Sequence, residues 1–250
     1  MRKVAVVNLK GGVGKTTTTV NLAFAFAKKG KRVLLVDLDP QANLTLTLCV
    51  SNSKTMYDLL VDEETHISEC IVNYNENLDV IPSKNLDKAE LIMAGLPGRE
   101  TILKRKFEPI FNYDFVLIDC PPSNTLLNYN ALLYVNEAFV PVSTDYLGLV
   151  GLRKVVKLID EINSLFNHAV VISAIIPTMY DQRSKISKES LEEIKKGFNG
   201  VILNPIRVNA IVKDMAKKGK SIFDLDKNAR ATSDYMKIAN RLLSNEFEFF

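Results

Sequence analysis

A glycine-rich stretch, KGGVGKTT, occupies residues 10–17 of the chain. Its three glycines would let the backbone turn tightly and aim several N–H groups at phosphate oxygens. Lys15 could reach the β- and γ-phosphates of a nucleotide, and the hydroxyl of Thr16 could bind Mg²⁺. The residues predicted to bind the nucleotide are Lys10, Gly11, Gly12, Val13, Gly14, Lys15, Thr16 and Thr17.

This loop departs from the common phosphate-loop pattern at two neighbouring positions. The pattern G-x-x-x-x-G-K-[ST] would place a glycine at position 9, where this chain has Leu9, and a second lysine follows at Lys10. The alternative to a phosphate loop is a glycine-rich turn with two solvated lysines. An apolar run before the loop and a helical pattern after it favour the phosphate loop.

Two acidic motifs follow apolar runs. In VLLVDLDPQAN, residues 33–43, Asp37 and Asp39 stand at the predicted carboxyl end of a strand, where open α/β sheets bind their ligands. Taken alone, this motif fits a simple turn equally well, because Asp-Pro favours turns. In YDFVLIDCPPS, residues 113–123, Asp119 has the form of a Walker B carboxylate that would hold Mg²⁺.

Short apolar runs alternate with helix-length amphipathic stretches along the chain. The runs lack polar alternation, as expected for parallel strands buried on both faces. The predicted strands are residues 4–8, 32–37, 78–82, 115–119, 138–142, 169–176 and 201–203. The predicted helices are residues 15–29, 85–94, 100–109, 126–134, 147–165, 186–198 and 233–243. This order predicts an α/β fold with a doubly wound, mostly parallel β-sheet, flanked by helices on both faces, in one domain spanning residues 1–250.

The composition is that of a soluble globular protein, with 47% hydrophobic and 24% charged residues among 250. No apolar run approaches the length of a membrane span, and the first residues turn polar too early for a signal peptide, so we expect a cytoplasmic protein. Because the first predicted strand begins at residue 4, we expect no N-terminal helix-turn-helix. Three cysteines without C-x-x-C spacing predict reduced thiols, and the two distant histidines predict no metal site.

Together these motifs resemble the ParA/Soj family of partition ATPases, within the wider P-loop group that has a deviant Walker A loop. The specific matches are KGGVGKTT (10–17), DLDPQAN (37–43) and VLIDCPPS (116–123). Looser matches are PVSTDYLGLVGL (141–152), IIPTMYDQR (175–183) and AKKGKSIFDLD (216–226). The resemblance therefore covers nearly the whole chain.

The resemblance implies a dimerisation switch driven by ATP. Lys10 would be the signature lysine, which contacts nucleotide phosphates across the interface of an ATP-bound sandwich homodimer. The implied catalytic residues are Lys10, Lys15 and Asp39, the last orienting the attacking water. The implied Mg²⁺ site comprises Thr16, Asp37 and Asp119. Family members hydrolyse ATP slowly, their ATP dimers bind double-stranded DNA without sequence specificity, and a ParB-like centromere-binding partner stimulates hydrolysis.

A basic stretch near the C-terminal end offers a surface for DNA. Residues 207–220 contain five basic residues and one acid. A solvated charged face is the usual meaning of such a stretch, and DNA backbone binding is the alternative that the resemblance favours. The implied DNA-binding residues are Arg183, Arg207, Lys213, Lys217 and Lys218.

The sequence thus predicts a nucleoid-associated ATPase that segregates a chromosome or plasmid. The main alternative is a MinD-like membrane ATPase, in which Phe247, Phe249 and Phe250 would insert into lipid. Glu246 and Glu248 would oppose this by facing anionic lipid, so we expect no stable membrane association. An iron–sulfur relative would need paired cysteines, whereas Cys120 reads as a small core residue. A metabolic P-loop synthetase would need a second catalytic cluster, which the sequence does not indicate.

Overall fold

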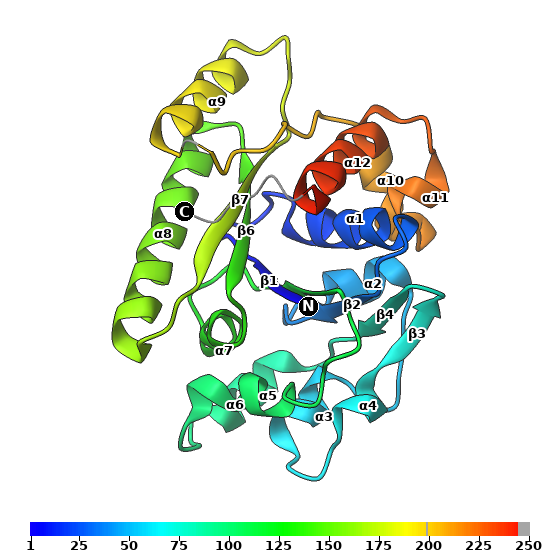
Figure 1. The fold of residues 1–250 in the computed structure, drawn as a ribbon, viewed down its shortest axis with the longest axis vertical. Coiled ribbons are helices and arrows are strands. Elements are labelled where there is room, and N and C mark those ends of the chain that lie inside the picture. The colour runs from blue at the N-terminus through cyan, green and yellow to red at the C-terminus, as the bar shows by residue number, and fades with distance from the viewer. Residues whose placement is uncertain (199, 245–250) are drawn as a thin grey trace.

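A seven-stranded sheet runs through the computed structural model, which describes residues 1–198 and 200–244 (Figure 1). The strand order is β3-β4-β2-β5-β1-β6-β7. All neighbouring pairs of this sheet are parallel except β3 and β4, which form an antiparallel hairpin at one edge. The strands are β1 (Arg2–Val6), β2 (Val33–Asp37), β3 (Val72–Asn75), β4 (Leu78–Ile81), β5 (Phe115–Asp119), β6 (Glu137–Ser143) and β7 (Val171–Thr178). The predicted doubly wound sheet is confirmed.

Helices cover both faces of the sheet (Figure 1). One face carries α1 (Lys15–Lys28), α2 (Asn43–Leu48), α10 (Ile211–Lys218), α11 (Ile222–Leu225) and α12 (Arg230–Leu243). The other carries α3 (Met56–Val61), α4 (Ile67–Cys70), α5 (Leu86–Met93), the 3₁₀ turn η1 (Arg99–Thr101), α6 (Ile102–Lys106), α7 (Leu126–Tyr134), α8 (Tyr146–Phe166) and α9 (Lys185–Gly197).

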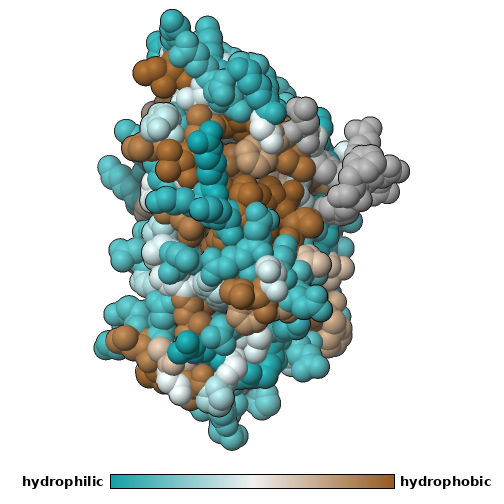
Figure 2. Space-filling view, turned by 90° about the vertical axis from the view of Figure 1, so that its left-hand side faces the viewer, coloured by the Kyte–Doolittle hydropathy of each residue, from teal (hydrophilic) through white to brown (hydrophobic). Residues whose placement is uncertain are grey.

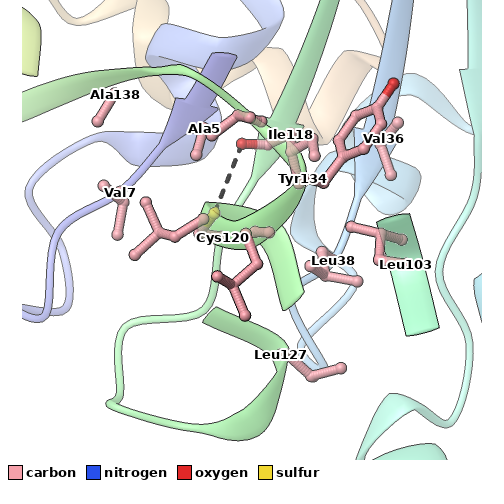
Figure 3. Close-up of a cluster of buried hydrophobic side chains, with 14 of the residues drawn as sticks. Ala5, Val7, Val36, Leu38, Leu103, Ile118, Cys120, Leu127, Tyr134 and Ala138 are labelled. Carbon is pink, nitrogen blue, oxygen red and sulfur yellow. Dashed lines mark hydrogen bonds between the residues drawn. The ribbon is translucent and has the colours of Figure 1, made fainter. Parts of the chain in front are cut away.

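The central strands are buried on both faces because successive side chains point to opposite sides of the sheet. In β1, Val4 and Val6 pack under α1, whereas Ala5 packs in the cluster on the opposite face. Cys120 lies in that second cluster near Leu127 and is fully buried, and its thiol donates to the Ile118 carbonyl oxygen at 3.7 Å (Figure 3). The prediction that Cys120 is a small core residue is confirmed.

The structure corrects several predicted elements. Residues 201–203 do not form a strand, because pairing is limited to an isolated bridge between Ile202 and Ile175. Pro205 follows shortly and has no N–H to extend the ladder. The predicted helix 100–109 is shorter and starts as a 3₁₀ turn. The elements that the sequence did not predict are α2, α3, α4, β3, α10 and α11.

The surface that carries α8 and α9 mixes apolar and charged side chains (Figure 2). Exposed apolar residues such as Leu165 and Ile186 lie on these helices, and Lys–Glu pairs line α9. Such a mixture is ordinary for a globular protein. Within the described part of the chain, none of the helices combines the length and hydrophobicity that crossing a bilayer requires. The tail residues Glu246–Phe250 on which the MinD-like alternative depends lie outside the described residues.

Candidate nucleotide site

The glycine-rich loop connects β1 to α1 at the carboxyl edge of the sheet. Gly12 and Gly14 have φ of 74° and 86°, in the left-handed region that a side chain would disfavour. Gly14 is also the N-cap of α1, which has no side-chain cap and no acidic residue in its first turn. The N–H groups at this helix end are therefore available to an anion, as the sequence predicted for a phosphate.

Lys15 begins α1 and is 7% exposed. Its Nζ lies 3.5 Å from the carbonyl oxygen of Lys10, so the side chain folds back over the loop. Burial lowers the pKa of Lys15, while the nearby carboxylates of Asp119 and Asp39 act in the opposite direction. A buried ammonium among backbone N–H groups leaves positive potential for phosphate oxygens to neutralise.

Two acidic residues lie side by side in the sheet register at the ends of β2 and β5. Asp37 is the direct partner of Asp119, and both are fully buried. The Asp119 carboxylate accepts hydrogen bonds from the hydroxyls of Thr16 at 2.6 Å and Thr19 at 3.1 Å. The Asp37 carboxylate instead accepts from the backbone N–H and the hydroxyl of Thr45, at 2.8 and 2.6 Å. The structure thus brings Thr16 and Asp119 together and connects Asp37 to α2.

Burial raises the pKa of both acids because it disfavours their charged forms. The pKa of Asp119 rises to about 8, with the charge of Asp37 as a further cause, and that of Asp37 rises to about 6. A divalent cation would stabilise the ionised forms. A buried carboxylate joined to a hydroxyl at a phosphate loop is an oxygen donor set that Mg²⁺ prefers, so Thr16 and Asp119 fit this ion.

The raised pKa of Asp119 predicts a pH dependence of the metal-free protein. Between about pH 4 and pH 8 the folded state holds a proton on Asp119 that the unfolded chain has lost, so stability falls as the pH rises. We expect the free energy of unfolding of the wild type, relative to Asp119→Asn, to drop by about 1–3 kcal/mol from pH 5.5 to pH 8.5. Urea denaturation of both proteins without Mg²⁺ at the two pH values measures this difference in the free energy of unfolding. A difference that stays level or grows in favour of the wild type would contradict the assignment.

Asp39 lines a cavity of about 350 Å³ beside the phosphate loop. The residue is 5% exposed, and its carboxylate accepts from the Gln41 N–H at 2.9 Å. Part of the lining comes from α10, a helix that the sequence did not predict. The lining residues are Gly11, Gly12, Gly14, Lys15, Thr16, Thr17, Asp39, Gln41, Asn43, Thr47, Pro122, Met179, Val212, Met215 and Ala216. A nucleotide could place its phosphates at the loop and the rest of the molecule between α2 and α10.

Lys10 points away from this cavity toward the N-terminus of α8. Its Nζ donates to both carboxylate oxygens of Asp145, at 2.9 and 3.1 Å, and to the Ser143 hydroxyl at 3.0 Å. Asp145 is also the N-cap of α8 and accepts from the Gly148 N–H at 2.7 Å. The ion pair is partly exposed, with side-chain exposures of 25% and 46%, so solvent screens it. Lys10 is therefore held within its own chain by a weak contact.

Two glycines allow α8 to approach Lys10 this closely. A Cβ at Gly148 would lie 1.9 Å from the Ser143 carbonyl oxygen, and one at Gly151 would lie 2.8 Å from Asn8 Oδ1. A side chain at either position would push the helix away from the loop. Asp145, Gly148 and Gly151 were not predicted as site residues; the DYLGLVGL segment within the looser matches was the available signal.

The predicted DNA-binding residues fall into two groups. Arg183, with a 92% exposed side chain, and Arg207 line a pocket of about 300 Å³, and Arg230, which the sequence did not single out, lines it too. Arg207 makes a bidentate ion pair with Asp234, whose shorter distance is 2.6 Å. The second group, Lys213, Lys217 and Lys218, is exposed on α10. Their contact with DNA stays a prediction.

The amino-acid sequence is similar to those of known proteins. Residues 1–172 match the family described as AAA domain. The chain is 37% identical to the sporulation initiation inhibitor protein Soj of Bacillus subtilis, over 97% of this chain and 98% of Soj. It is 32% identical to the chromosome partitioning protein ParA of Caulobacter vibrioides, over 98% of this chain and 95% of ParA.

Solved structures share the fold. Cobyrinic acid a,c-diamide synthase from Mycobacterium smegmatis, with bound ATP analogue and magnesium, has a TM-score of 0.84 at 29% identity, over 97% of this chain and 94% of that chain. The septum site-determining protein MinD from Pyrococcus horikoshii, with Mg-ADP, has a TM-score of 0.80 at 24% identity, over 97% of this chain and 96% of that chain. On the sequence matches to Soj and ParA over their full lengths, the chain belongs to the ParA/Soj family of partition ATPases.

Proposed function

We propose that this protein is a Mg²⁺-dependent ATPase that segregates a chromosome or plasmid. ATP would drive two copies into a sandwich homodimer, the dimer would bind double-stranded DNA non-specifically, and hydrolysis stimulated by a ParB-like partner would release it. The protein would act in the cytoplasm, on the nucleoid. The observation that best supports this proposal is the position of Lys10, which lies beside the phosphate loop but points away from its own cavity.

Within one subunit, the loop and α1 would bind the phosphates of ATP. The N–H groups of the loop and the Lys15 ammonium would bind the phosphate oxygens. Thr16 and Asp119 would hold Mg²⁺, which when bound would neutralise charge on those oxygens. Asp39, in the lining of the cavity, would orient the attacking water through its carboxylate. Asp37, which accepts a hydrogen bond from the Thr45 hydroxyl, would hold the start of α2 against the end of β2.

In the dimer, the Lys10 ammonium of one subunit would contact the phosphates of the nucleotide bound to the other subunit. A phosphoryl-transfer transition state spreads charge over the γ-phosphate oxygens, and a cation brought by a neighbouring subunit stabilises that charge. The partly exposed pair with Asp145 costs little to break. Asp145 would thus hold Lys10 in the free subunit and release it when the γ-phosphate of a second subunit offers a stronger partner.

DNA binding would use the pocket lined by Arg183, Arg207 and Arg230 together with the lysines of α10. Phosphate contacts need cations at suitable positions and no base-reading motif. The guanidinium of Arg207 is fixed by the buried carboxylate of Asp234, so replacing Arg207 would leave that charge unpaired. Arg183 and Arg230 are therefore the better residues to change.

The test of this proposal is DNA binding in the presence of ATP. With Mg-ATP, but not with Mg-ADP, the wild type should bind a random-sequence duplex. Arg183→Ala with Arg230→Ala should weaken binding about tenfold or more and lower the slope of log K against log salt by about one per lost phosphate contact. Fluorescence anisotropy over a range of salt concentrations measures both.

The matched control is Lys104→Ala, which removes an exposed cation from α6, far from this pocket (Figure 1). It should leave affinity and salt slope unchanged. Equal affinity of the wild type with ATP and ADP would contradict the nucleotide switch. An unchanged salt slope in the double arginine variant would show that these arginines belong to an ordinary solvated surface.

A further inference from the structure

We infer that Thr45 and Ser83 are positioning residues for ATP hydrolysis, which hold Asp39 in the lining of the nucleotide cavity. This inference rests on the proposed function, because it concerns the same site. The two residues come from different elements. Thr45 lies in the first turn of α2, and Ser83 follows β4. They meet because β4 and β2 are neighbouring parallel strands, with Ile81 opposite Val36, so their carboxyl ends lie together.

The Thr45 hydroxyl both donates and accepts a hydrogen bond. It donates to Asp37 Oδ2 at 2.6 Å and accepts from the Ser83 N–H at 2.8 Å. Asp37 Oδ2 also accepts from the Thr45 N–H, at 2.8 Å. Asp37 thereby serves as the cap of α2, whose N-cap residue, Ala42, has φ of 53° and offers no side-chain acceptor. One side chain therefore joins the ends of β2 and β4 to the start of α2.

The network closes on the backbone of Asp39. The Ser83 hydroxyl donates to the Asp39 carbonyl oxygen at 3.1 Å, and the Asp39 N–H donates to Asp37 Oδ1 at 3.3 Å. Ser83 is 5% exposed, so this contact is shielded from water. Both backbone polar groups of Asp39 are thus bound to a set of side chains that are themselves tied to Thr45.

Polar contacts orient the loop that connects β2 to α2, because apolar packing anchors this loop only at its ends. Leu38 and Leu44 are fully buried, whereas Pro40 is half-buried and Gln41 is exposed. Asp39 must face the cavity to orient a water molecule there. A misplacement of about 1 Å in such a group can reduce a reaction rate about a hundredfold. Loss of an interaction that is made only in the transition state lowers kcat without weakening substrate binding. The hydroxyls of Thr45 and Ser83 therefore affect the rate rather than nucleotide affinity.

The experiment compares Thr45→Val, which keeps the shape and removes the hydroxyl, with Thr45→Ser, which keeps the hydroxyl. We expect Thr45→Val to lower kcat about tenfold to a hundredfold, with KM and the Kd for ATP within about twofold of the wild type. Thr45→Ser should restore kcat to near the wild-type value. Ser83→Ala should lower kcat less, and the double variant should lose less than the product of the single losses, because both hydroxyls belong to one network.

Several outcomes would overturn the inference. Wild-type kcat in Thr45→Val would do so, as would an equal loss of kcat in Thr45→Ser. A fall in kcat accompanied by an equal loss of ATP affinity would indicate general damage to the site rather than misplacement of Asp39. The proposed function fails separately, if the wild-type protein with Mg-ATP releases no more phosphate than a Lys15→Ala control. A Thr45→Val enzyme as fast as an active wild type refutes the inference alone.

Discussion

Lys10→Ala should bind ATP with nearly unchanged affinity and lose hydrolysis by about a hundredfold or more. Affinity should hold because the Lys10 side chain contacts Asp145 and Ser143 rather than the cavity of its own subunit. Hydrolysis should fall because Lys10 is the cation proposed to reach the γ-phosphate from the neighbouring subunit. A fluorescent-nucleotide titration and phosphate-release kinetics measure the two quantities on the same preparation.

Asp145→Asn is the matched control for this variant. It weakens the same ion pair from the other side, while the asparagine side-chain oxygen can still accept from the Gly148 N–H and cap α8. If loss of the pair itself damaged the site, Asp145→Asn would also be inactive. We expect it to hydrolyse ATP, since Lys10 remains free to act. A Lys10→Ala protein that retains hydrolysis would contradict the role given to the signature lysine.

Lys15→Ala should abolish nucleotide binding, with an increase in Kd of about a hundredfold or more. Charge-assisted hydrogen bonds to phosphate are each worth about 1.5–3 kcal/mol, and Lys15 is placed to make more than one. The metal-free, nucleotide-free variant should stay folded, because burial lowers the pKa of Lys15 and its removal relieves a buried charge. ATP-dependent thermal shifts measure the effect.

The ATP-dependent thermal shift should differ between Lys10→Ala and Lys15→Ala. Saturating Mg-ATP should raise the Tm of the wild type and of Lys10→Ala, since a ligand that binds the folded state stabilises it. It should leave the Tm of Lys15→Ala unchanged. A Tm increase in Lys15→Ala equal to that of the wild type would refute the assignment of the loop.

The parts of the fold that the sequence predicted are those whose pattern is local. β5 matches the predicted range 115–119 and β2 nearly so, because strands buried on both faces read as continuous apolar runs. The resemblance to partition ATPases assigned Asp37 and Asp119 to one Mg²⁺ site, and the strand register sets the two residues opposite each other. The loop glycines were predicted from the conformations that such a turn requires.

Features that depend on tertiary contacts were not predictable from those patterns. α2 and α11 are four to six residues long, too short for a periodic signal. Asp145 and Ser83 gain their roles from partners 135 and 38 residues away, and Arg230 from a pocket whose elements meet only in the folded chain. The strand predicted at 201–203 failed for the opposite reason, because an apolar triplet does not ensure a partner along its whole length.

Lys10 is proposed to act on the nucleotide of the neighbouring subunit, and mixing two inactive variants tests this role. Lys10→Ala retains Asp39, and Asp39→Ala retains Lys10, so a mixed dimer contains one complete site if Lys10 acts across the interface. Mixed in equal amounts before Mg-ATP is added, the two should regain about a quarter of the wild-type hydrolysis, since half of the dimers are mixed and each has one active site in two. If the mixture stays as inactive as each variant alone, Lys10 does not act across the interface.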